Sequence, residues 1–542
     1  MIGQKMIRVL VIICFVALSF GCEKFPSTPK ASPSVETQQP PVPSLDPAIR
    51  IHWLGKNKIA ADTNAASFMQ IWELPETVKL EAQTLDRLSG APWRLLLRQT
   101  NQASALLLRP LLDDLVAEES CVEVRKSTNA ASGNDEMLLA IRLNDQRAAL
   151  WQTNLAAAFE SLTGIHPTTS QLSTPNSQLP AGWSLRKHHA PNLIEFVRAG
   201  EWVIVGAAQD HNVLLDETLA RIERDHAPFS ASAMNSWLDL NINFPRKGTA
   251  RSDLPAMLPE ISLTMIGDGH NVLTRGRLNF SGAVPIVSES WHIPTNFIGG
   301  DLSSFTALRA GTQQFLSQFW SEFETNPPPR EFYSWSGSDV PMQTYVAAPV
   351  NDASNAVSRL SDFVLEKANA WFVTNDMVKF QRAKAFNGLE WKGVPYIAPF
   401  VKSTEASGQG FMVGGFFPLI DSNQPLPQPL LARIHEQPNL VYYDWESTGP
   451  RLEQWTYITQ LLRLLTEKPQ LPADSPAVKW LQSMSKKLGP CSTEIVRNSD
   501  QEFSLTRSGS VPFTAIELQL LIDWSESPSF PSRDAFLNHS RH

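Results

Sequence analysis

The N-terminal stretch restricts the fold more than any later one, because it decides which part of the chain folds and in which compartment. Lys5 and Arg8 precede an unbroken apolar run from Val9 to Ala17. This run falls short of the roughly 20 apolar residues that a helix needs to cross a bilayer, so it predicts the apolar region of a signal peptide. We therefore expect residues 1–21 to be a leader that is removed on export.

The end of this leader carries a small residue, Gly21, directly before Cys22. The arrangement resembles the lipobox of bacterial lipoproteins, in which the cysteine is acylated, for example with palmitate, and becomes the mature N-terminus. One position departs from the pattern, since Ser19 stands where an aliphatic residue is usual and Leu18 lies one step further out. The resemblance implies a lipid on Cys22 and attachment to a membrane through it. The alternative is an ordinary secretory signal that is cleaved elsewhere.

Residues 22–47 are rich in proline and serine and poor in large apolar side chains. Such a composition buries too little surface to offset the entropy of ordering the chain, so we expect an extended tether. At about 3 Å per residue, the tether lets the folded body stand several nanometres from the membrane.

The body that follows, residues 48–542, is longer than one hydrophobic core usually accommodates, which predicts two or more modules. The formal net charge of the whole chain is −8 and basic runs are absent, which argues against nucleic acid as a partner.

Hydrophobic periodicity predicts mixed elements along the body. Cys121–Arg125 and Met137–Leu143 indicate a hairpin, which a long helix follows after Asn144-Asp145. A helix is expected over Leu302–Phe323 and another over Asp352–Phe372. Strands followed by long helices favour an α+β fold, with repeated modules of antiparallel sheet and long helices packed on one face.

The recurrence of strand, long helix and meandering strands from about residues 137, 343 and 439 sets the predicted boundaries. These are a signal peptide (1–21), a tether (22–47), a first α+β module (48–235), a central antiparallel β block (236–295), a second α+β module (296–438), a third (439–530) and a polar tail (531–542).

An internal repeat is also predicted from two short stretches, Ser120–Ser127 and Cys491–Ser499. Each follows a helix and places a cysteine at the entry of a hairpin strand that carries Glu, an aliphatic pair and Arg. Chance similarity between two hairpins is the alternative. In addition, Ala61-Asp62-Thr63-Asn64-Ala65, opening strand–helix modules behind a lipoprotein-like leader, resembles a group of exported bacterial proteins of unknown function. That resemblance implies location and architecture and supplies no catalytic motif.

Two cysteines remain after Cys14 is lost with the leader and Cys22 is acylated. Cys121 and Cys491 are an even remainder in an oxidising compartment, which favours a disulfide between them. Two separate buried thiols are the alternative.

Several stretches contain residue types that catalysis or metal binding uses, and none of them assigns a catalytic residue, a metal site or a cofactor. Ser334–Ser338 lacks the first glycine of a nucleophile elbow, and the adjacent His188 and His189 point to opposite faces of a strand. Gly408–Gly415 contains turn glycines rather than a phosphate loop, because a strand follows.

Carboxylate pairs and tryptophans leave two further options open. Asp444 with Glu446, or Asp113 with Glu118, has the residue types of an acid/base pair, with solvated loop charges as the alternative. Aromatic rings near strand ends offer stacking surfaces for sugar or peptide, with core packing as the commoner role. The tryptophans concerned are Trp53, Trp335, Trp391 and Trp445.

The leading functional prediction is a non-catalytic, membrane-tethered lipoprotein of the cell envelope that binds or scaffolds an envelope protein or glycan. One alternative is a carboxylate-dependent hydrolase that acts on envelope glycan. Another is a carrier of an apolar ligand.

Overall fold

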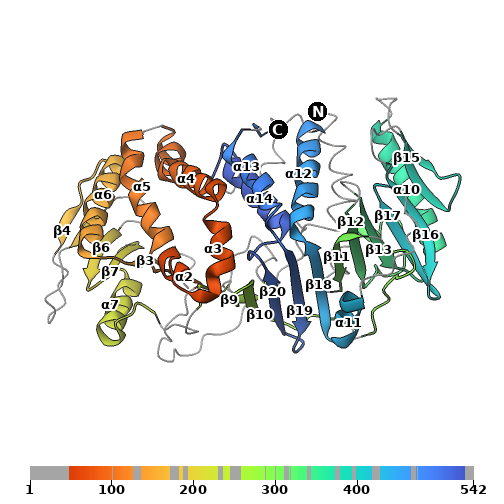
Figure 1. The fold of residues 1–542 in the computed structure, drawn as a ribbon, viewed down its shortest axis with the longest axis horizontal. Coiled ribbons are helices and arrows are strands. Elements are labelled where there is room, and N and C mark those ends of the chain that lie inside the picture. The colour runs from red at the N-terminus through yellow and green to blue at the C-terminus, as the bar shows by residue number, and fades with distance from the viewer. Residues whose placement is uncertain are drawn as a thin grey trace, which may run out of the picture. The chain divides into compact units, whose positions relative to one another are not determined.

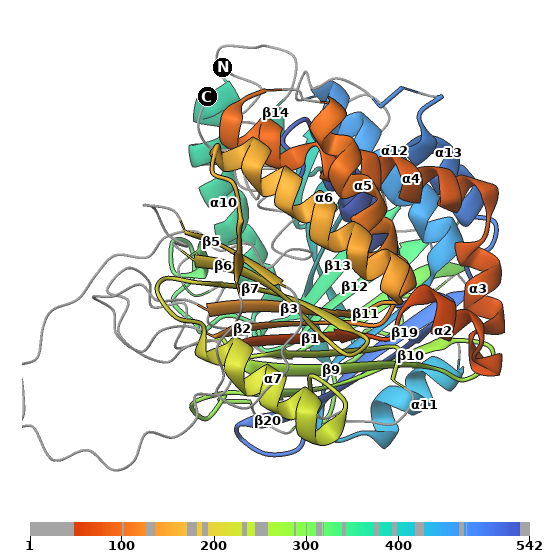
Figure 2. The same cartoon turned by 90° about the vertical axis from the view of Figure 1, so that its left-hand side faces the viewer.

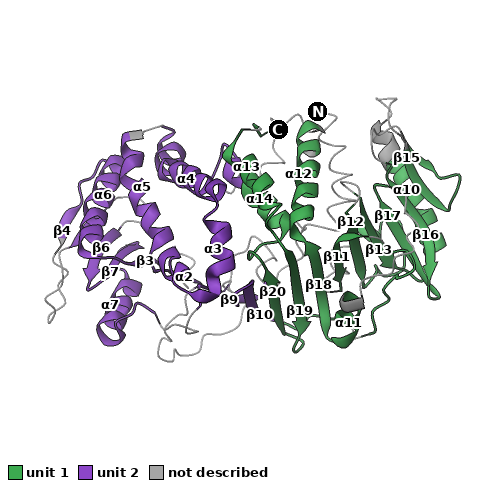
Figure 3. Ribbon diagram, viewed as in Figure 1, with its two compact units in different colours: residues 1–21, 282–523 green, residues 22–281, 524–542 purple. Residues whose placement is uncertain are grey.

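The computed structural model divides the chain into two compact units (Figure 3). Unit 2 takes residues 22–281 and 524–542, and unit 1 takes residues 1–21 and 282–523. The structure describes residues 48–99, 102–125, 136–170, 182–186, 193–229, 236–243, 258–286, 289–299, 301–309, 317, 319–338, 343–372, 379–392, 398–417, 428–465, 471–472 and 474–531.

The described residues of unit 2 form a sheet of ten strands in which every neighbouring pair is antiparallel. Figure 1 labels several of these strands. The strand order is β10-β9-β8-β1-β2-β3-β7-β6-β5-β4, so the first strand lies inside the sheet between β2 and β8. The strands are β1 (Ile49–Trp53), β2 (Ser120–Arg125), β3 (Glu136–Arg142), β4 (Thr168–Ser170), β5 (Gly182–Arg186), β6 (Leu193–Ala199), β7 (Trp202–Ala208), β8 (Leu238–Ile242), β9 (Glu260–Gly267) and β10 (Val272–Asn279).

Helices cover both faces of this sheet (Figure 2). Trp151 of α6 packs with Ile141 and Phe196 on one face, whereas Leu214 and Leu215 of α7 pack on the other face. The helical elements of unit 2 are α2 (Lys56–Ala60), η1 (Thr63–Ala65), α3 (Ala66–Trp72), α4 (Pro75–Ser89), η2 (Trp93–Leu97), α5 (Gln102–Ala117), α6 (Asp145–Thr163) and α7 (Val213–Asp225).

The last described residues of the chain return to unit 2 and bind α4. The Arg87 guanidinium donates hydrogen bonds to the carbonyl oxygens of Ser525 and Ser527 and lies 5.3 Å from the Phe530 ring centroid. Arg94 donates to the carbonyl of Phe530. These contacts fasten the C-terminal segment to the N-terminal helices.

The described part of unit 1 also has ten antiparallel strands, in the order β20-β19-β18-β11-β12-β13-β17-β16-β15-β14. Its first strand, β11, again lies inside the sheet, between β12 and β18. The strands are β11 (Leu302–Leu308), β12 (Phe332–Gly337), β13 (Thr344–Pro349), β14 (Lys379–Arg382), β15 (Gly388–Lys392), β16 (Phe400–Ala406), β17 (Gln409–Gly415), β18 (Leu440–Ser447), β19 (Pro490–Arg497) and β20 (Glu502–Gly509).

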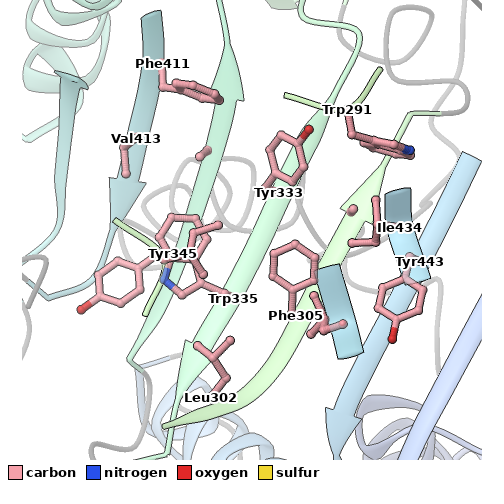
Figure 4. Close-up of a cluster of buried hydrophobic side chains, with 14 of the residues drawn as sticks. Trp291, Leu302, Phe305, Tyr333, Trp335, Tyr345, Phe411, Val413, Ile434 and Tyr443 are labelled. Carbon is pink, nitrogen blue, oxygen red and sulfur yellow. The ribbon is translucent and has the colours of Figure 1, made fainter. Parts of the chain in front are cut away.

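The core of unit 1 is an aromatic cluster on one face of its sheet (Figure 4). Phe305, Tyr333, Trp335 and Tyr345 come from three adjacent strands, and Ile434 of α11 covers them. The other helices of unit 1 include α10 and α12, which lie on the opposite side from α11 (Figure 2). The helices are α10 (Ala353–Phe372), α11 (Gln428–Glu436), α12 (Thr448–Leu465), α13 (Pro476–Met484) and α14 (Ala515–Glu526).

Both predicted hairpins are confirmed, and the strands within residues 236–295 pair antiparallel with one another. β2 pairs with β3, β19 pairs with β20, and β8 to β10 form a meander. The tight turn at Asp268-Gly269 is closed by a hydrogen bond from the Asp268 N–H to the Asn271 carbonyl, with Gly269 at φ +96 in the left-handed region that favours glycine. Mixed helix and antiparallel sheet is therefore the observed class.

Three details differ from the sequence-based expectations. Helices cover both sheet faces, because each sheet buries apolar side chains on both sides. The central block, 236–295, does not stand apart, since β8 pairs with β1 and completes the sheet of unit 2. Residues 302–308 form a strand rather than the start of a helix, because Phe305 and Ala307 face the aromatic core while Thr306 alternates to the other side.

The two separate cores generate a prediction. Phe305→Ala in unit 1 and Phe196→Ala in unit 2 each remove a side chain that is at most 1 % exposed, and each should lower the free energy of unfolding of its own unit by about 3–5 kcal/mol. Urea unfolding followed by circular dichroism should show two transitions, with each variant shifting a different one. A single transition that both variants shift equally would contradict two independent cores.

Candidate functional site

Two acidic side chains, Asp444 and Glu446, lie on one face of β18. Strand residues alternate between faces, and the intervening Trp445 packs with Tyr443 on the side of the aromatic core. Asp444 is partly buried and Glu446 is 4 % exposed. The structure thus places this carboxylate pair, which the sequence singled out, on the same side of the sheet.

Each of the two carboxylates accepts a hydrogen bond that ties it to another element. Thr306 Oγ1, directly opposite on β11, donates to Asp444 Oδ1 at 2.6 Å. The backbone N–H of Ala515, the first residue of α14, donates to Glu446 Oε1 at 2.7 Å. Because the N-terminus of a helix carries partial positive charge, an ionised Glu446 stabilises the start of α14.

Asp444 belongs to a row of polar residues that crosses five strands. Arg507, Thr493, Asp444, Thr306 and Ser334 are directly opposed in register from β20 to β12. Arg507 Nε donates to Thr493 Oγ1 at 2.9 Å. Directly opposed residues of an antiparallel sheet share a face, so the row forms a polar strip.

A second polar row runs beside the first. Glu446, Ser304, Ser336 and Thr344 are directly opposed from β18 to β13. The Ser336 and Thr344 hydroxyls are 2.9 Å apart and share a hydrogen bond. The two rows together give this face of unit 1 a polar centre, in contrast to the aromatic cluster behind it.

Burial sets the electrostatics of the pair. It raises the pKa of Glu446 to about 7, with the charge of Asp444 acting in the same direction, and it also raises the pKa of Asp444. Arg451 of α12 is 4 % exposed, donates to Gln454 Oε1 at 2.8 Å, and has its pKa lowered by burial to about 10. A carboxyl group with a pKa near 7 exchanges a proton readily at neutral pH, as an acid/base group must.

Unit 2 has a buried ionisable group of its own, His52 on β1. Its Nε2 lies 3.2 Å from Glu119 Oε1, its Nδ1 lies 3.6 Å from Asp239 Oδ2, and its ring centroid is 4.1 Å from that of Phe229. Burial lowers the pKa of His52, but the two carboxylates outweigh it and raise the pKa above its ordinary value. The pKa of Glu119 falls to about 2, because its hydrogen bonds to His52 and Lys58 outweigh its burial.

A second buried ion cluster joins β1, β2 and α7. Glu123 is 1 % exposed and accepts from Arg50 Nε at 2.6 Å and from Arg221 Nη2 at 2.9 Å. Two guanidinium groups offset the cost of burying one carboxylate. We interpret this cluster as structural, since it fixes the central strand against its neighbours.

The other carboxylate pair, Asp113 with Glu118, does not form a shared site. The exposed Asp113 pairs with Arg109 on its own helix, whereas the half-buried Glu118 accepts from Asn57 Nδ2 at 2.9 Å. Separate partners give the two carboxylates separate, structural roles.

The remaining stretches take structural positions where they are described. Ser336 is fully buried on β12. Gly408 occupies the β16–β17 turn at φ +77, so turn geometry accounts for a glycine there. His188 and His189 lie outside the described residues.

The four singled-out tryptophans pack in three different clusters. Trp335 and Trp445 belong to the aromatic core of unit 1, Trp391 packs beneath α10, and Trp53 packs near Trp237 in unit 2. They therefore share no common exposed face.

Cys121 and Cys491 are free and buried, one in each unit. Burial raises the pKa of each thiol to about 12. A thiol with such a pKa is a weak nucleophile at neutral pH. Cys22 lies outside the described residues.

Sequence reasoning missed three features. Arg451 and Arg507 approach the carboxylate pair from α12 and β20, which no sequence pattern predicted. The surrounding network of His52 was also missed, because its two carboxylates lie far from it along the chain. The third feature is an exposed run of leucines, Leu95, Leu96 and Leu97, here called the leucine tip, whose exposed fractions are 44 %, 74 % and 38 %.

In the described part of the chain, no group of three or more His, Cys, Asp or Glu side chains is arranged to hold a metal ion. Within the same residues, no helix combines the length and the apolar character needed to span a bilayer. Comparisons with protein-family models, with curated proteins and with solved structures find no match for this chain.

The raised pKa of Glu446 generates a pH prediction. The folded state binds a proton between about pH 4.5 and pH 7 where the unfolded chain has released it, so stability falls as pH rises through this window. Glu446→Gln keeps an acceptor for the Ala515 N–H and removes the titratable group. Between pH 4.5 and pH 7 the free energy of unfolding of the variant should therefore fall by about 3 kcal/mol less than that of the parent chain. Urea unfolding at several pH values measures the difference, and parallel stability curves would contradict it.

Proposed function

We propose that the protein is a lipid-anchored protein of the cell envelope with a non-catalytic binding or scaffolding role. The leader supports the anchor, since a basic start and a short apolar run end in Gly21-Cys22. The proline- and serine-rich composition of residues 22–47 supports the tether, which precedes β1 in the sequence. The proposed partner classes are the membrane, through the lipid, and an envelope protein or glycan.

The observation that carries the binding role is the leucine tip. Exposure of large apolar side chains to water is unfavourable in free energy. Consecutive exposed apolar residues mark interaction sites more often than scattered ones do. Leu96 is 74 % exposed between two leucines that are also exposed, and Leu106 of α5 in the same unit is 71 % exposed. A contact surface explains why these side chains remain outside the core.

The scaffold itself supports an internal duplication. If β1 to β10 are matched in turn with β11 to β20, the strand order of unit 2 becomes that of unit 1. The helices after the third and seventh strands also correspond, α6 with α10 and α7 with α11. This correspondence pairs β2 with β12 and β19 with β9, so it differs from the predicted match between the strands of Cys121 and Cys491. A measured strand order that differs between the two units would refute the duplication.

A second candidate function, a carboxylate-dependent hydrolase of envelope glycan, is favoured by Asp444 and Glu446. Paired carboxyl groups, one of them protonated near neutral pH, are the groups that glycoside hydrolysis uses. Release of reducing ends from isolated envelope glycan tests it. If the parent chain releases reducing ends and Asp444→Asn and Glu446→Gln each abolish that release, the hydrolase is established. If the parent chain releases no reducing ends, the hydrolase is refuted.

The lipid anchor generates a prediction about localisation. Cys22→Ser should move the protein from the membrane fraction to the soluble fraction, because one thioether-linked lipid group provides the hold on the bilayer. Cys14→Ser is the matched control, since this cysteine lies inside the leader and should leave the fractionation unchanged. Immunoblots of the two fractions make the measurement, and equal membrane retention of both variants would contradict the anchor.

A further inference from the structure

The leucine tip is held by a defined turn. Trp93, which opens η2, is 1 % exposed, and its Nε1 donates to Ser161 Oγ of α6 at 3.1 Å. The Gln99 N–H donates to the Trp93 carbonyl at 3.2 Å and closes the turn around the leucines. Arg98 sits between them at φ 55, a left-handed conformation that reverses the chain. The apolar side chains are therefore presented outward by a turn anchored at both ends.

The charged residues next to the tip in the sequence are basic. Arg94 and Arg98 flank the three leucines; Arg98 is exposed and Arg94 donates to the Phe530 carbonyl, whereas Arg109, further along the chain, pairs with Asp86 and Asp113. The whole chain carries a formal net charge of −8, so this stretch runs against the average of the protein. Exposed leucines flanked by arginines complement a bilayer surface, which has an apolar acyl region beneath anionic headgroups.

We infer that the leucine tip inserts into an anionic lipid bilayer, as a second point of membrane contact for unit 2. The inference rests on the proposed function, because acylation of Cys22 would hold the unit near the bilayer. The tether ends at the start of β1, and β1 and η2 belong to the same unit. A lipid anchor raises the effective concentration of the tip at the membrane, so even weak insertion becomes populated.

Lipid explains the tip better than a protein partner does. A bilayer interface accepts leucine side chains in its acyl region and arginine guanidinium groups at its phosphates. A second copy of this chain would instead have to bury the arginines or find carboxylates for them. Contact between two copies is therefore the rival outcome that the experiment must separate.

The experiment labels the full-length acylated protein at Leu96→Cys with an environment-sensitive dye. Val213→Cys is the matched control, because Val213 is 43 % exposed and begins α7, on the opposite face of the sheet of unit 2. The buried Cys121 and Cys491 should label poorly. Each labelled protein is reconstituted into two kinds of vesicle, one containing phosphatidylglycerol and one of phosphatidylcholine alone. Both kinds carry a quencher attached to a lipid.

Dye at position 96 should be quenched in the anionic vesicles, less in the zwitterionic ones, and dye at position 213 in neither. Adding Leu97→Glu should reduce the fraction of inserted tip about tenfold or more, since it places a charge where an apolar side chain was buried. Equal quenching at 96 and 213 would overturn the inference. Concentration-dependent protection of position 96 without lipid would overturn it in favour of contact between copies.

Failure of the inference can be told apart from failure of the proposed function. If the acylated protein floats with vesicles in a Cys22-dependent manner and position 96 is not quenched, only the inserted tip is refuted. If the acylated protein does not float at all, the anchor itself is refuted.

Discussion

The pairing of the first strand of each unit holds both sheets together. β1 hydrogen-bonds to β2 on one side and to β8 on the other, and β11 does the same with β12 and β18. Each of these two strands therefore joins the six strands that follow it in the sequence to the last three strands of its unit. Without that pairing, each unit would be left with two smaller sheets whose apolar faces no longer match the helices above and below them. The partners of this strand lie far from it along the chain, so its pairing must offset the conformational entropy that is lost when the intervening segments are closed into loops.

Buried charges lie where this strand meets its neighbours. Arg50 and His52 of β1 engage carboxylates from β2, from β8 and from the turn that precedes β2, while Thr306 of β11 donates to Asp444 of β18. A misregistered strand would leave such groups buried without partners, which is costly. The charges thus select one register and one partner. In unit 1 the same arrangement leaves two carboxyl groups with raised pKa values, so the strand junction is also the place where protonation and fold are linked.

Local patterns predicted much of the secondary structure and little of the assembly. The hairpin that begins at Cys121 and the turn at Asp268-Gly269 are visible in the sequence because their signals lie within a few residues. The sequence predicts a helix over Leu302–Phe323, and the pairing of residues 302–308 with β12 and β18 makes that part a strand instead.

The candidate site was predictable only in part. The sequence indicates Asp444 and Glu446 only as residue types of an acid/base pair, with solvated loop charges as the alternative. Their separation from solvent and the approach of Arg451 depend on contacts between distant segments. The sequence does not predict the leucine tip for a related reason. A run of leucines is usually part of a core, and the exposure of these leucines depends on the folded unit.

The central claim is that the folded units are held at a membrane by a lipid on the first mature residue. Mass spectrometry of the N-terminal peptide of the mature protein tests it most directly. The account predicts a peptide that begins at Cys22 and carries the added mass of a diacylglyceryl group. A mature chain that begins at another residue, or at an unmodified Cys22, would contradict it.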